Sequence, residues 1–290
     1  MQWQTSRYLI DLRSPKVMGI VNVTPDSFSD GGQHASRNAA LVHCERLVRD
    51  GADILDIGGE STRPGALELP VEEELERVLP LVRHAVNLGV PVSVDTYKPQ
   101  VMQAVLDLGA DIINDVWALR WPGDPAGRTG TDVIHQHRNC GVCLMHMHRN
   151  PQTMQATPME GDVVPQVLSF LEHKTQHLRG LGVNSARIAI DPGIGFGKTV
   201  QQNFALLAQQ SALLPMGYAI LAGWSRKSSL AAVTEDSLST VATLDIRDRL
   251  VPSVTAALLA VQNGAHVVRV HDVRETVQAL KVFSAMQQRC

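Results

Sequence analysis

Polar and charged side chains stand at or near the ends of short apolar runs along the whole chain. These residues are Asn22, Asp56, Asp95, Asn114, His146, Asp191, Lys227, Arg269 and His271. Asp95 and Asp191 are carboxylates, which accept hydrogen bonds. Lys227, Arg269 and His271 are cations or potential cations, which bind anions. Together these residue types suit a ligand that donates hydrogen bonds and also carries negative charge.

The apolar runs beside these residues are typical of buried parallel strands. We expect strands at 17–22, 54–57, 91–94, 112–113, 142–145, 188–190, 218–221 and 267–270. Apolar residues at helical spacing lie between them, and a weak helix is expected at about 132–139. Eight strands that alternate with helices predict an α/β fold, a (β/α)8 TIM barrel. We expect a single barrel domain at 17–290 after an N-terminal extension at 1–16.

A doubly wound sheet is the alternative α/β architecture. It rarely needs eight such units in this length, and the loop after the first run lacks the glycine pattern of dinucleotide binding. In a barrel, the C-terminal ends of all strands meet at one mouth, so the polar residues named above are expected to lie together. The cations follow the last two strands, which is the usual phosphate side of such barrels.

Composition excludes several classes of protein. The chain has 290 residues, of which 44% are hydrophobic and 19% charged, and its net charge is -3. This balance gives no argument for nucleic acid or an anionic membrane as partner. No apolar stretch approaches the roughly 18 to 20 residues that span a bilayer, and residues 1–11 lack a signal-peptide pattern. Four cysteines do not make a disulfide scaffold in a chain this long, so a cytoplasmic location is expected.

Four local motifs point to other chemistry. The run Gly193 to Thr199 resembles the end of a phosphate-binding loop, but its spacing is wrong by one residue. Cys140 and Cys143 form a single CxxC without a second pair, so a zinc or redox role is a minority interpretation. His146 and His148 could offer two imidazoles to a metal, again without placed carboxylates. Lys227 at a strand end could form a Schiff base, as in barrel aldolases, and this alternative stays open on the fold alone.

Several motifs, in order along nearly the whole chain, resemble those of the dihydropteroate synthase family. The two opening motifs are NVTPDSFSDGG at 22–32 and GGESTRPG at 58–65. The later ones are SVDT at 93–96, IND at 113–115, LMHM at 144–147, DPGIGFGK at 191–198, SRKS at 225–228 and RVHD at 269–272. Related pterin-binding methyltransferases share the barrel, but not both opening loops and SRKS.

The resemblance implies a fold, an activity and partners. Members of the family are (β/α)8 barrels, commonly homodimers, and they are the sulfonamide target. They condense (7,8-dihydropterin-6-yl)methyl diphosphate with para-aminobenzoate to give 7,8-dihydropteroate and diphosphate in folate biosynthesis. The chain is therefore expected to be a transferase that acts on these small molecules, with Mg²⁺ as cofactor, by an SN1-like substitution.

The resemblance also implies roles for individual residues. The pterin is expected to contact Asp95, Asn114, Met145, Asp191, Lys227 and Arg269, of which Asp95, Asp191 and Lys227 are the expected catalytic residues. The diphosphate is expected to contact Asn22, Arg269 and His271, with Asn22 as the Mg²⁺ ligand. The para-aminobenzoate pocket is expected to contain Phe28, Thr62, Arg63, Pro64, Phe196, Lys227 and Ser228.

Two features depart from the family pattern. Arg149 stands where a small residue is common, and the loop at 117–130 is longer and richer in proline and glycine than usual. Two further classes stay open on the sequence. A methyl transfer domain would need a corrinoid partner, and a silent pterin-binding paralogue would be expected to lose residues such as Asn22 or His271.

Overall fold

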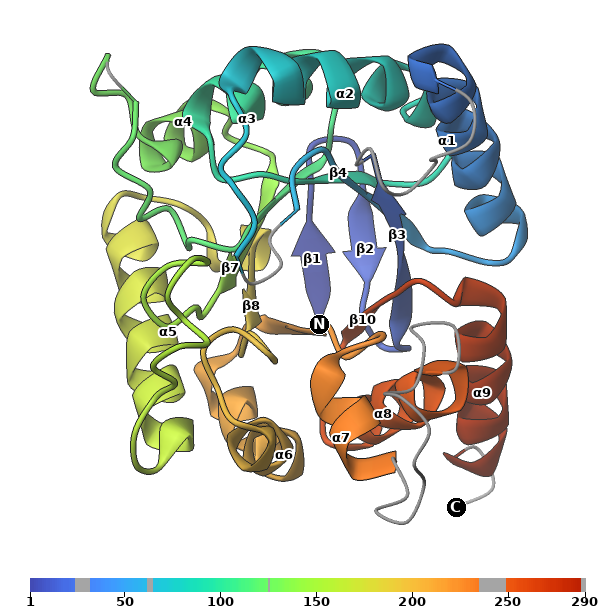
Figure 1. Cartoon of the computed structure of the whole chain (residues 1–290), viewed down its shortest axis with the longest axis vertical. Helices are drawn as coiled ribbons and strands as arrows, with labels where there is room; N and C mark the ends of the chain where they lie inside the picture. Colours follow the sequence, from blue (N-terminus) through green and yellow to red (C-terminus); the bar gives the residue numbers. More distant parts are fainter. Residues whose placement is uncertain (24–31, 62–64, 125, 235–248, 288–290) are drawn as a thin grey trace.

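Parallel strands and helices alternate from residue 16 to the end of the last helix (Figure 1). The structure, a computed structural model, describes residues 1–23, 32–61, 65–124, 126–234 and 249–287. The strands of the main sheet are β3 (Lys16–Asn22), β4 (Ile54–Gly58), β5 (Val92–Asp95), β6 (Ile112–Asp115), β7 (Gly141–Met145), β8 (Ile188–Asp191), β9 (Ala219–Ala222) and β10 (Val267–Val270). Within the described residues, these eight parallel strands close into a barrel in which β10 pairs with β3. The predicted (β/α)8 TIM barrel is confirmed.

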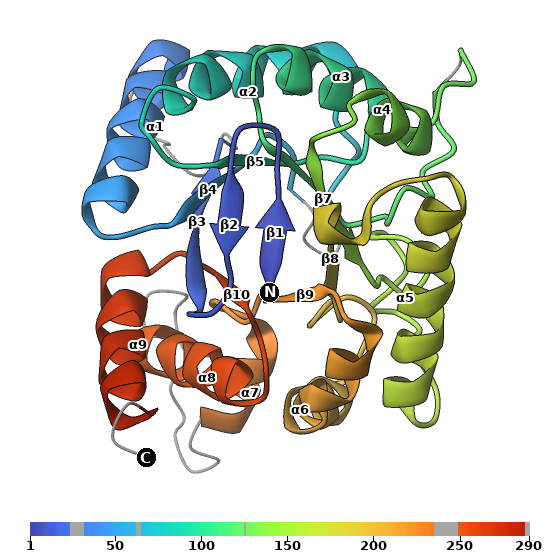
Figure 2. The same cartoon turned by 180° about the vertical axis from the view of Figure 1, so that it is seen from behind.

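Helices surround the barrel and cover the outer face of its strands (Figures 1 and 2). They are α1 (Gly32–Arg49), α2 (Val71–Ala85), α3 (Pro99–Asp107), α4 (Gly130–Gln136), α5 (Val163–Gly180), α6 (Val200–Ala208), α7 (Ser228–Thr234), α8 (Leu250–Gln262) and α9 (Val273–Gln287), with the 3-10 turns η2 (Ser185–Arg187) and η3 (Gln210–Met216). The weak helix expected at about 132–139 begins earlier, because Thr129 and Asp132 form a capping box that starts α4.

A β-hairpin that the sequence did not predict closes the N-terminal end of the barrel. Its strands β1 (Gln2–Gln4) and β2 (Leu9–Asp11) are antiparallel and cross that end in Figure 2. Trp3 is fully buried there among inward-facing residues such as Met18 and Ile112, and its indole Nε1 donates to the carbonyl of Arg187 at 3.0 Å. This N-terminal end, the floor of the barrel, is therefore a packed core. The active site of such a barrel lies at the opposite, C-terminal end of the strands.

Each strand is short and buried, so its sequence reads as a continuous apolar run. Strand β9 begins one residue later than expected, and β6 extends two residues further, to Asp115. Asp115 is fully buried and accepts hydrogen bonds from the backbone N–H groups of Trp117 and Leu119, both at 2.7 Å. These bonds shape the beginning of the 117–130 loop, in which Ala118 and Leu119 have positive φ angles of 50° and 58°.

Candidate active site

The registers of neighbouring strands place the predicted polar residues at one level of the barrel. Asn22 on β3 pairs with Gly58 on β4, and Gly58 pairs with Asp95 on β5. Asp95 pairs in turn with Asn114 on β6. On the other side, Met145 on β7 pairs with Asp191 on β8. The sequence expectation that these residues share the mouth of the barrel agrees with this register.

Arg269 occupies the centre of the charged group. Its Nε donates to Oδ2 of Asp56 at 2.6 Å, and its Nη2 donates to Oδ2 of Asp95 at 2.8 Å. Asn114 also donates to Oδ2 of Asp56, at 3.3 Å. Burial acts to lower the pKa of Arg269, but Asp56 and Asp95 outweigh it and raise that pKa above its ordinary value. The guanidinium is therefore a permanent cation between two carboxylates.

The second oxygen of each of these two carboxylates is available to a ligand. Oδ1 of Asp56 and Oδ1 of Asp95 are buried and have no hydrogen-bond partner among the described residues. Burial raises the pKa of Asp95 to about 7, against the opposing effect of Arg269. A buried carboxylate oxygen without a donor is costly, so this corner of the site favours a ligand that supplies N–H groups.

Asp191 and Lys227 form the opposite side of the mouth. Oδ1 of Asp191 accepts a hydrogen bond from the N–H of Gly193 at 2.7 Å. Burial raises the pKa of Asp191, whereas Gly193 and Lys227 oppose that shift. Burial lowers the pKa of Lys227 to about 8, against the attraction of Asp191. The Lys227 Nζ lies 4.3 Å from the ring centroid of Phe196, a cation–π contact.

A buried lysine shapes the loop that follows β8. Lys198 is 3% exposed, and its Nζ donates to the carbonyl of Gly193 at 2.7 Å, to the carbonyl of Phe196 at 3.2 Å and to Nδ1 of His146 at 2.9 Å. Burial and Lys198 lower the pKa of His146 to about 2, so this imidazole is neutral and accepts at Nδ1. His146 thus supports the loop and is not a free base at the mouth.

Apolar side chains line the space beside the charged groups. Met145 and Phe196 belong to a buried cluster with Tyr97, and Trp117 and Trp121 pack against it. A cavity of about 470 Å³ adjoins this cluster, and Tyr97, Trp117 and Trp121 line it. Glu60, Glu68 and Asn150 also line this cavity, so it combines aromatic walls with polar groups, as small-molecule pockets do.

His271 is held by Ser225 on the cation side of the mouth. The backbone N–H of His271 donates to Oγ of Ser225 at 3.1 Å, and the same Oγ lies 2.9 Å from Nδ1 of the imidazole. Beside it, Arg226 forms a salt bridge with Asp272 at 2.7 Å. These contacts orient the imidazole relative to the end of β10.

Asn22 offers an oxygen ligand that fits a small divalent cation. A Cβ on Gly58 would lie 3.6 Å from Oδ1 of Asn22 and 3.5 Å from the Cβ of Asp95. The side chains of Asn22 and Asp95 therefore flank Gly58. In the described part of the chain, no group of three or more His, Cys, Asp or Glu side chains could hold a metal by itself. Mg²⁺ commonly takes one or two protein oxygens and fills its other positions with phosphate and water, so this donor set fits Mg²⁺ bound together with a phosphorylated ligand.

Part of the predicted para-aminobenzoate pocket lies outside the described residues. Phe28, Thr62, Arg63 and Pro64 are in this group. The structure does describe Phe196, which is buried, and Ser228, which is exposed at the start of α7. Phe196 neighbours Lys227 through the cation–π contact, and Ser228 is the next residue in the chain.

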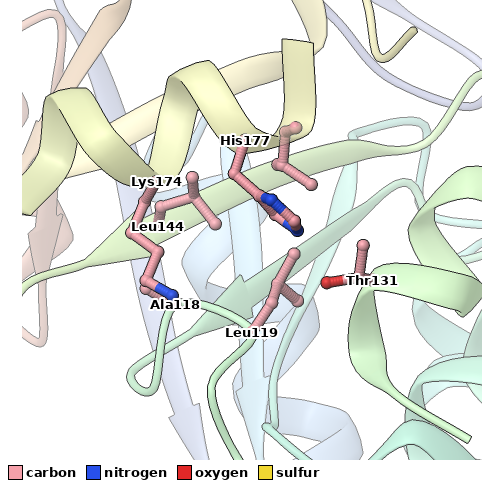
Figure 3. Close-up of a pocket in the computed structure, with 7 residues that line it drawn as sticks. Ala118, Leu119, Thr131, Leu144, Lys174 and His177 are labelled. Atoms are coloured by element: carbon pink, nitrogen blue, oxygen red, sulfur yellow. The ribbon is translucent and has the colours of Figure 1, made fainter. Parts of the chain in front are cut away.

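A separate small cavity near α5 is not part of this site. Lys174 extends toward Ala118, and the His177 ring points toward Leu119 and Thr131 (Figure 3). Its volume is about 40 Å³, which is room for about one water molecule.

Two residues that are central to the geometry of the site, Asp56 and Lys198, are not among the predicted site residues. The signal for Asp56 is its place in the apolar run 54–57, where a buried carboxylate needs a partner. The sequence identifies Lys198 only as part of the motif at 191–198, and its burial, which makes acceptors necessary, is visible only in the structure. Arg269, the partner of Asp56, lies on β10, and Lys198 contacts His146 after β7, so neither contact can be read from the pattern of a single strand.

Comparison with known proteins places the chain among characterised sequences. Residues 18–271 match the family described as Pterin binding enzyme. The dihydropteroate synthase of Neisseria meningitidis serogroup B is 44% identical over 290 residues, which cover 98% of this chain and 97% of that protein.

Solved structures agree with this match. The Xanthomonas albilineans dihydropteroate synthase with 4-aminobenzoic acid has a TM-score of 0.88 and 46% identity, covering 99% of this chain and 98% of that one. The same enzyme in complex with 7,8-dihydropteroate has a TM-score of 0.85 and 43% identity, covering 99% of both chains. The Yersinia pestis dihydropteroate synthase in a sulfonamide drug complex has a TM-score of 0.89 and 38% identity, covering 99% of this chain and 100% of that one.

Proposed function

The chain belongs to the pterin-binding enzyme family as one of its dihydropteroate synthases, and from this premise we propose how its residues carry the reaction. The reaction is a transfer in folate biosynthesis that forms 7,8-dihydropteroate, and the family is a sulfonamide target. The substrates are (7,8-dihydropterin-6-yl)methyl diphosphate and para-aminobenzoate. The observation that carries the proposal is the buried Asp56–Arg269–Asp95 group beside Asn114.

The pterin lies between Met145 and Arg269, and its ring N–H groups meet the carboxylates. Asp95 and Asp191 accept hydrogen bonds from the ring and its amino group, and Asn114 adds an amide to the same edge. Lys227 donates to the ring carbonyl oxygen or to N5. The support is the pair of buried carboxylate oxygens without donors, on Asp56 and Asp95, which a pterin N–H would satisfy.

The diphosphate lies on the other side of the ring, at Asn22, Arg269 and His271. Asn22 would hold Mg²⁺ together with oxygens of the diphosphate, and the ion would neutralise charge on the departing group. Arg269 remains cationic at any physiological pH, because Asp56 and Asp95 raise its pKa. The His271 imidazole, oriented by Ser225, hydrogen-bonds the same group.

The chemical step is a substitution at the exocyclic methylene of the pterin. The bond from this carbon to the diphosphate oxygen breaks, and the electron pair leaves with the diphosphate. The nitrogen lone pair of para-aminobenzoate then forms the new C–N bond, and its surplus proton passes to the released diphosphate or to solvent. Positive charge builds on the ring in this SN1-like path, and the Asp95 and Asp191 carboxylates stabilise it electrostatically.

Para-aminobenzoate approaches between Phe196, Ser228 and the second loop, which carries Thr62, Arg63 and Pro64, and Phe28 contributes from the first loop. The aniline nitrogen is already neutral at pH 7, so it needs no strong general base. This agrees with the neutral, loop-bound state of His146, which lies near the mouth without serving as a base.

Two further expectations concern the whole molecule. A homodimer is supported by exposed apolar residues on two adjacent helices, Val251 and Leu259 on α8 and Val282 and Met286 on α9. A cytoplasmic location stays a prediction from the sequence. No helix in the described ranges is long and apolar enough to cross a membrane.

The test is diphosphate release by the purified protein, with dihydropterin methyl diphosphate, Mg²⁺ and para-aminobenzoate each omitted in turn. The proposal requires release that depends on all three, with dihydropteroate as product. Pterin binding without turnover would contradict the catalytic roles. Turnover that survives removal of Mg²⁺ by a chelator would contradict the role of Asn22 as a metal ligand.

A further inference from the structure

Lys198 shapes the loop after β8, but the proposed reaction gives it no part. Its side chain is buried, and its Nζ donates to the carbonyl of Gly193 at 2.7 Å and to the carbonyl of Phe196 at 3.2 Å. These carbonyls are at the two ends of one turn, in which the N–H of Phe196 donates to the carbonyl of Gly193 at 3.2 Å. The same ammonium donates to Nδ1 of His146, the residue after β7, at 2.9 Å. Lys198 therefore binds the 193–196 turn to the end of a neighbouring strand.

The 193–196 turn contacts both polar residues on its side of the mouth. The N–H of Gly193 donates to Oδ1 of Asp191 at 2.7 Å, while the carbonyl of the same glycine accepts from the buried ammonium. A Cβ on Gly195 would lie 3.2 Å from Cδ of Lys227, so the turn also packs against this side chain. The position of the turn therefore sets the surroundings of Asp191 and Lys227.

The backbone of Lys198 is fixed by the start of α6. Thr199 is the N-cap of this helix and forms a capping box with Gln202. Asn203 donates through Nδ2 to the carbonyl of Lys198 at 3.5 Å, and its Oδ1 accepts the N–H of Gly195 at 2.8 Å. A helix of the outer layer therefore holds the lysine and the turn in one arrangement.

Within the described residues, the ammonium of Lys198 hydrogen-bonds only to neutral acceptors, which are backbone carbonyls and the neutral imidazole of His146. Burial lowers the pKa of Lys198 to about 7, and Asp191 opposes that shift. The lysine in turn acts with Lys227 and Arg269 to lower the pKa of Asp191 against burial. A second ammonium behind the turn thus favours the ionised form of Asp191.

We propose that Lys198 is a positioning residue for the carboxylate of Asp191: by holding the turn, it keeps the N–H of Gly193 on that carboxylate, and its charge favours the ionised state that the pterin meets. This inference rests on the proposed role of Asp191 as an acceptor for the pterin. Misplacement of a binding group by about 1 Å can cost up to 100-fold in rate. Loss of the lysine should therefore weaken pterin binding although Lys198 itself does not touch the ring.

The decisive experiment compares Lys198→Met with Arg187→Met. Arg187 is also buried and also donates to backbone carbonyls, those of Ile134, His137 and Cys140, but it lies at the floor of the barrel. Both variants leave buried carbonyls without a donor, so both lose stability. In calorimetric titration we expect Lys198→Met to raise the Kd for the pterin diphosphate about tenfold. Arg187→Met should stay within about twofold of the wild type at a temperature at which both variants are folded.

The ionisation of Asp191 gives a readout that a loss of stability alone would not move. Carbon NMR of isotope-labelled aspartate carboxyl groups reports it, and the signal of Asp191 is the one that is absent from Asp191→Asn. In Lys198→Met its titration midpoint should lie at higher pH than in the wild type, on the order of one pH unit, because an opposite charge is lost. Lys227 and Arg269 still face Asp191 in this variant, as does the thiol of Cys143, which stays neutral because burial raises its pKa.

If Lys198→Met does not fold, Lys198→Gln takes its place, since its amide can still donate to a carbonyl but carries no charge; the same rise of the midpoint is expected. The double variant Asp191→Asn/Lys198→Met should bind the pterin no more weakly than Asp191→Asn alone, because the lysine acts through that carboxylate.

Three results would each overturn the proposal: an unchanged Kd in Lys198→Met, an equal rise in Arg187→Met, or a midpoint of Asp191 that does not move. These count against Lys198 alone when Asp191→Asn binds the pterin weakly. Wild-type affinity in Asp191→Asn would instead overturn the proposed role of Asp191, and the inference with it.

Discussion

Arg269 and Asp56 form an ion pair inside the mouth of the barrel, with Nε of the arginine 2.6 Å from Oδ2 of the aspartate. Asp56 is fully buried, so the pair fixes the direction of the guanidinium before any ligand binds. A preorganised cation of this kind needs no reorganisation when negative charge develops on a leaving group.

The first prediction concerns Asp56→Asn. The variant keeps the shape of the side chain but removes its charge, so Arg269 loses one of its two anionic partners. We expect the free energy of unfolding to fall by about 1.5–3 kcal/mol and kcat/KM for the pterin substrate to fall about 10- to 100-fold. Denaturant titration and steady-state kinetics measure the two effects. Asp53→Asn, which alters a partly exposed carboxylate 3.8 Å from Lys16, is the control and should change neither by much.

Asp95→Ala tests the electrostatic role of the other partner. Removal of one preorganised group that stabilises transition-state charge typically costs about 100- to 1,000-fold in kcat. We expect a loss of this size, and calorimetric titration with the pterin diphosphate separates it from weaker binding. Near-normal turnover would show that Asp95 does not stabilise the cationic ring.

The activity should depend on pH through Lys227, whose pKa burial lowers to about 8. Above that pH the folded enzyme loses the positive charge beside Asp191, so kcat/KM for the pterin substrate should fall. Lys227→Met should have low activity without this decline.

The free energy of unfolding should change with pH in the opposite direction. Between the folded pKa and the ordinary value of 10.5 the unfolded chain holds the extra proton, so rising pH stabilises the wild type relative to Lys227→Met. A flat rate profile from pH 7 to 10 would contradict the role of the ammonium.

Most of the barrel could be predicted because each strand is short, apolar and followed by a polar residue. The contacts between side chains on different strands could not be predicted. Arg269 lies inside β10, and whether it turns toward Asp56 or toward solvent depends on the closure of β10 against β3. The hairpin was missed because β1 and β2 have three residues each, too few for a period to show. Sequence similarity supplied the residues of the second loop, which no strand pattern identifies.

Gly193→Ala tests the loop that supports Asp191. Gly193 has a φ of 68°, and a Cβ there would lie 1.8 Å from the carbonyl oxygen of His146. We expect the free energy of unfolding to fall by more than about 3 kcal/mol, and pterin binding to weaken because Asp191 loses its donor. Gly182→Ala is the matched control. Its φ is 85°, but no described atom lies within 4 Å of the added Cβ, so only the backbone cost of about 1–2 kcal/mol applies.

Trp3→Ala should separate stability from catalysis. The indole is fully buried in the floor, far along the strands from the mouth, and such truncations cost about 3–5 kcal/mol. Both substrate constants should match those of the wild type at a temperature where the variant is folded. A changed KM would mean that the floor and the mouth are coupled, in contradiction to their separate packing.

The Trp3 contact also has a consequence for synthesis in the cell. The indole Nε1 binds the carbonyl of Arg187, and 184 residues separate the two along the chain. At about 5–20 residues per second, a ribosome needs roughly 10 to 40 s to make that stretch. During this interval the Trp3 side chain is present without the complete pocket that buries it. The hairpin is thus made well before the part of the chain that buries it, so its final packing must wait for synthesis of that later part.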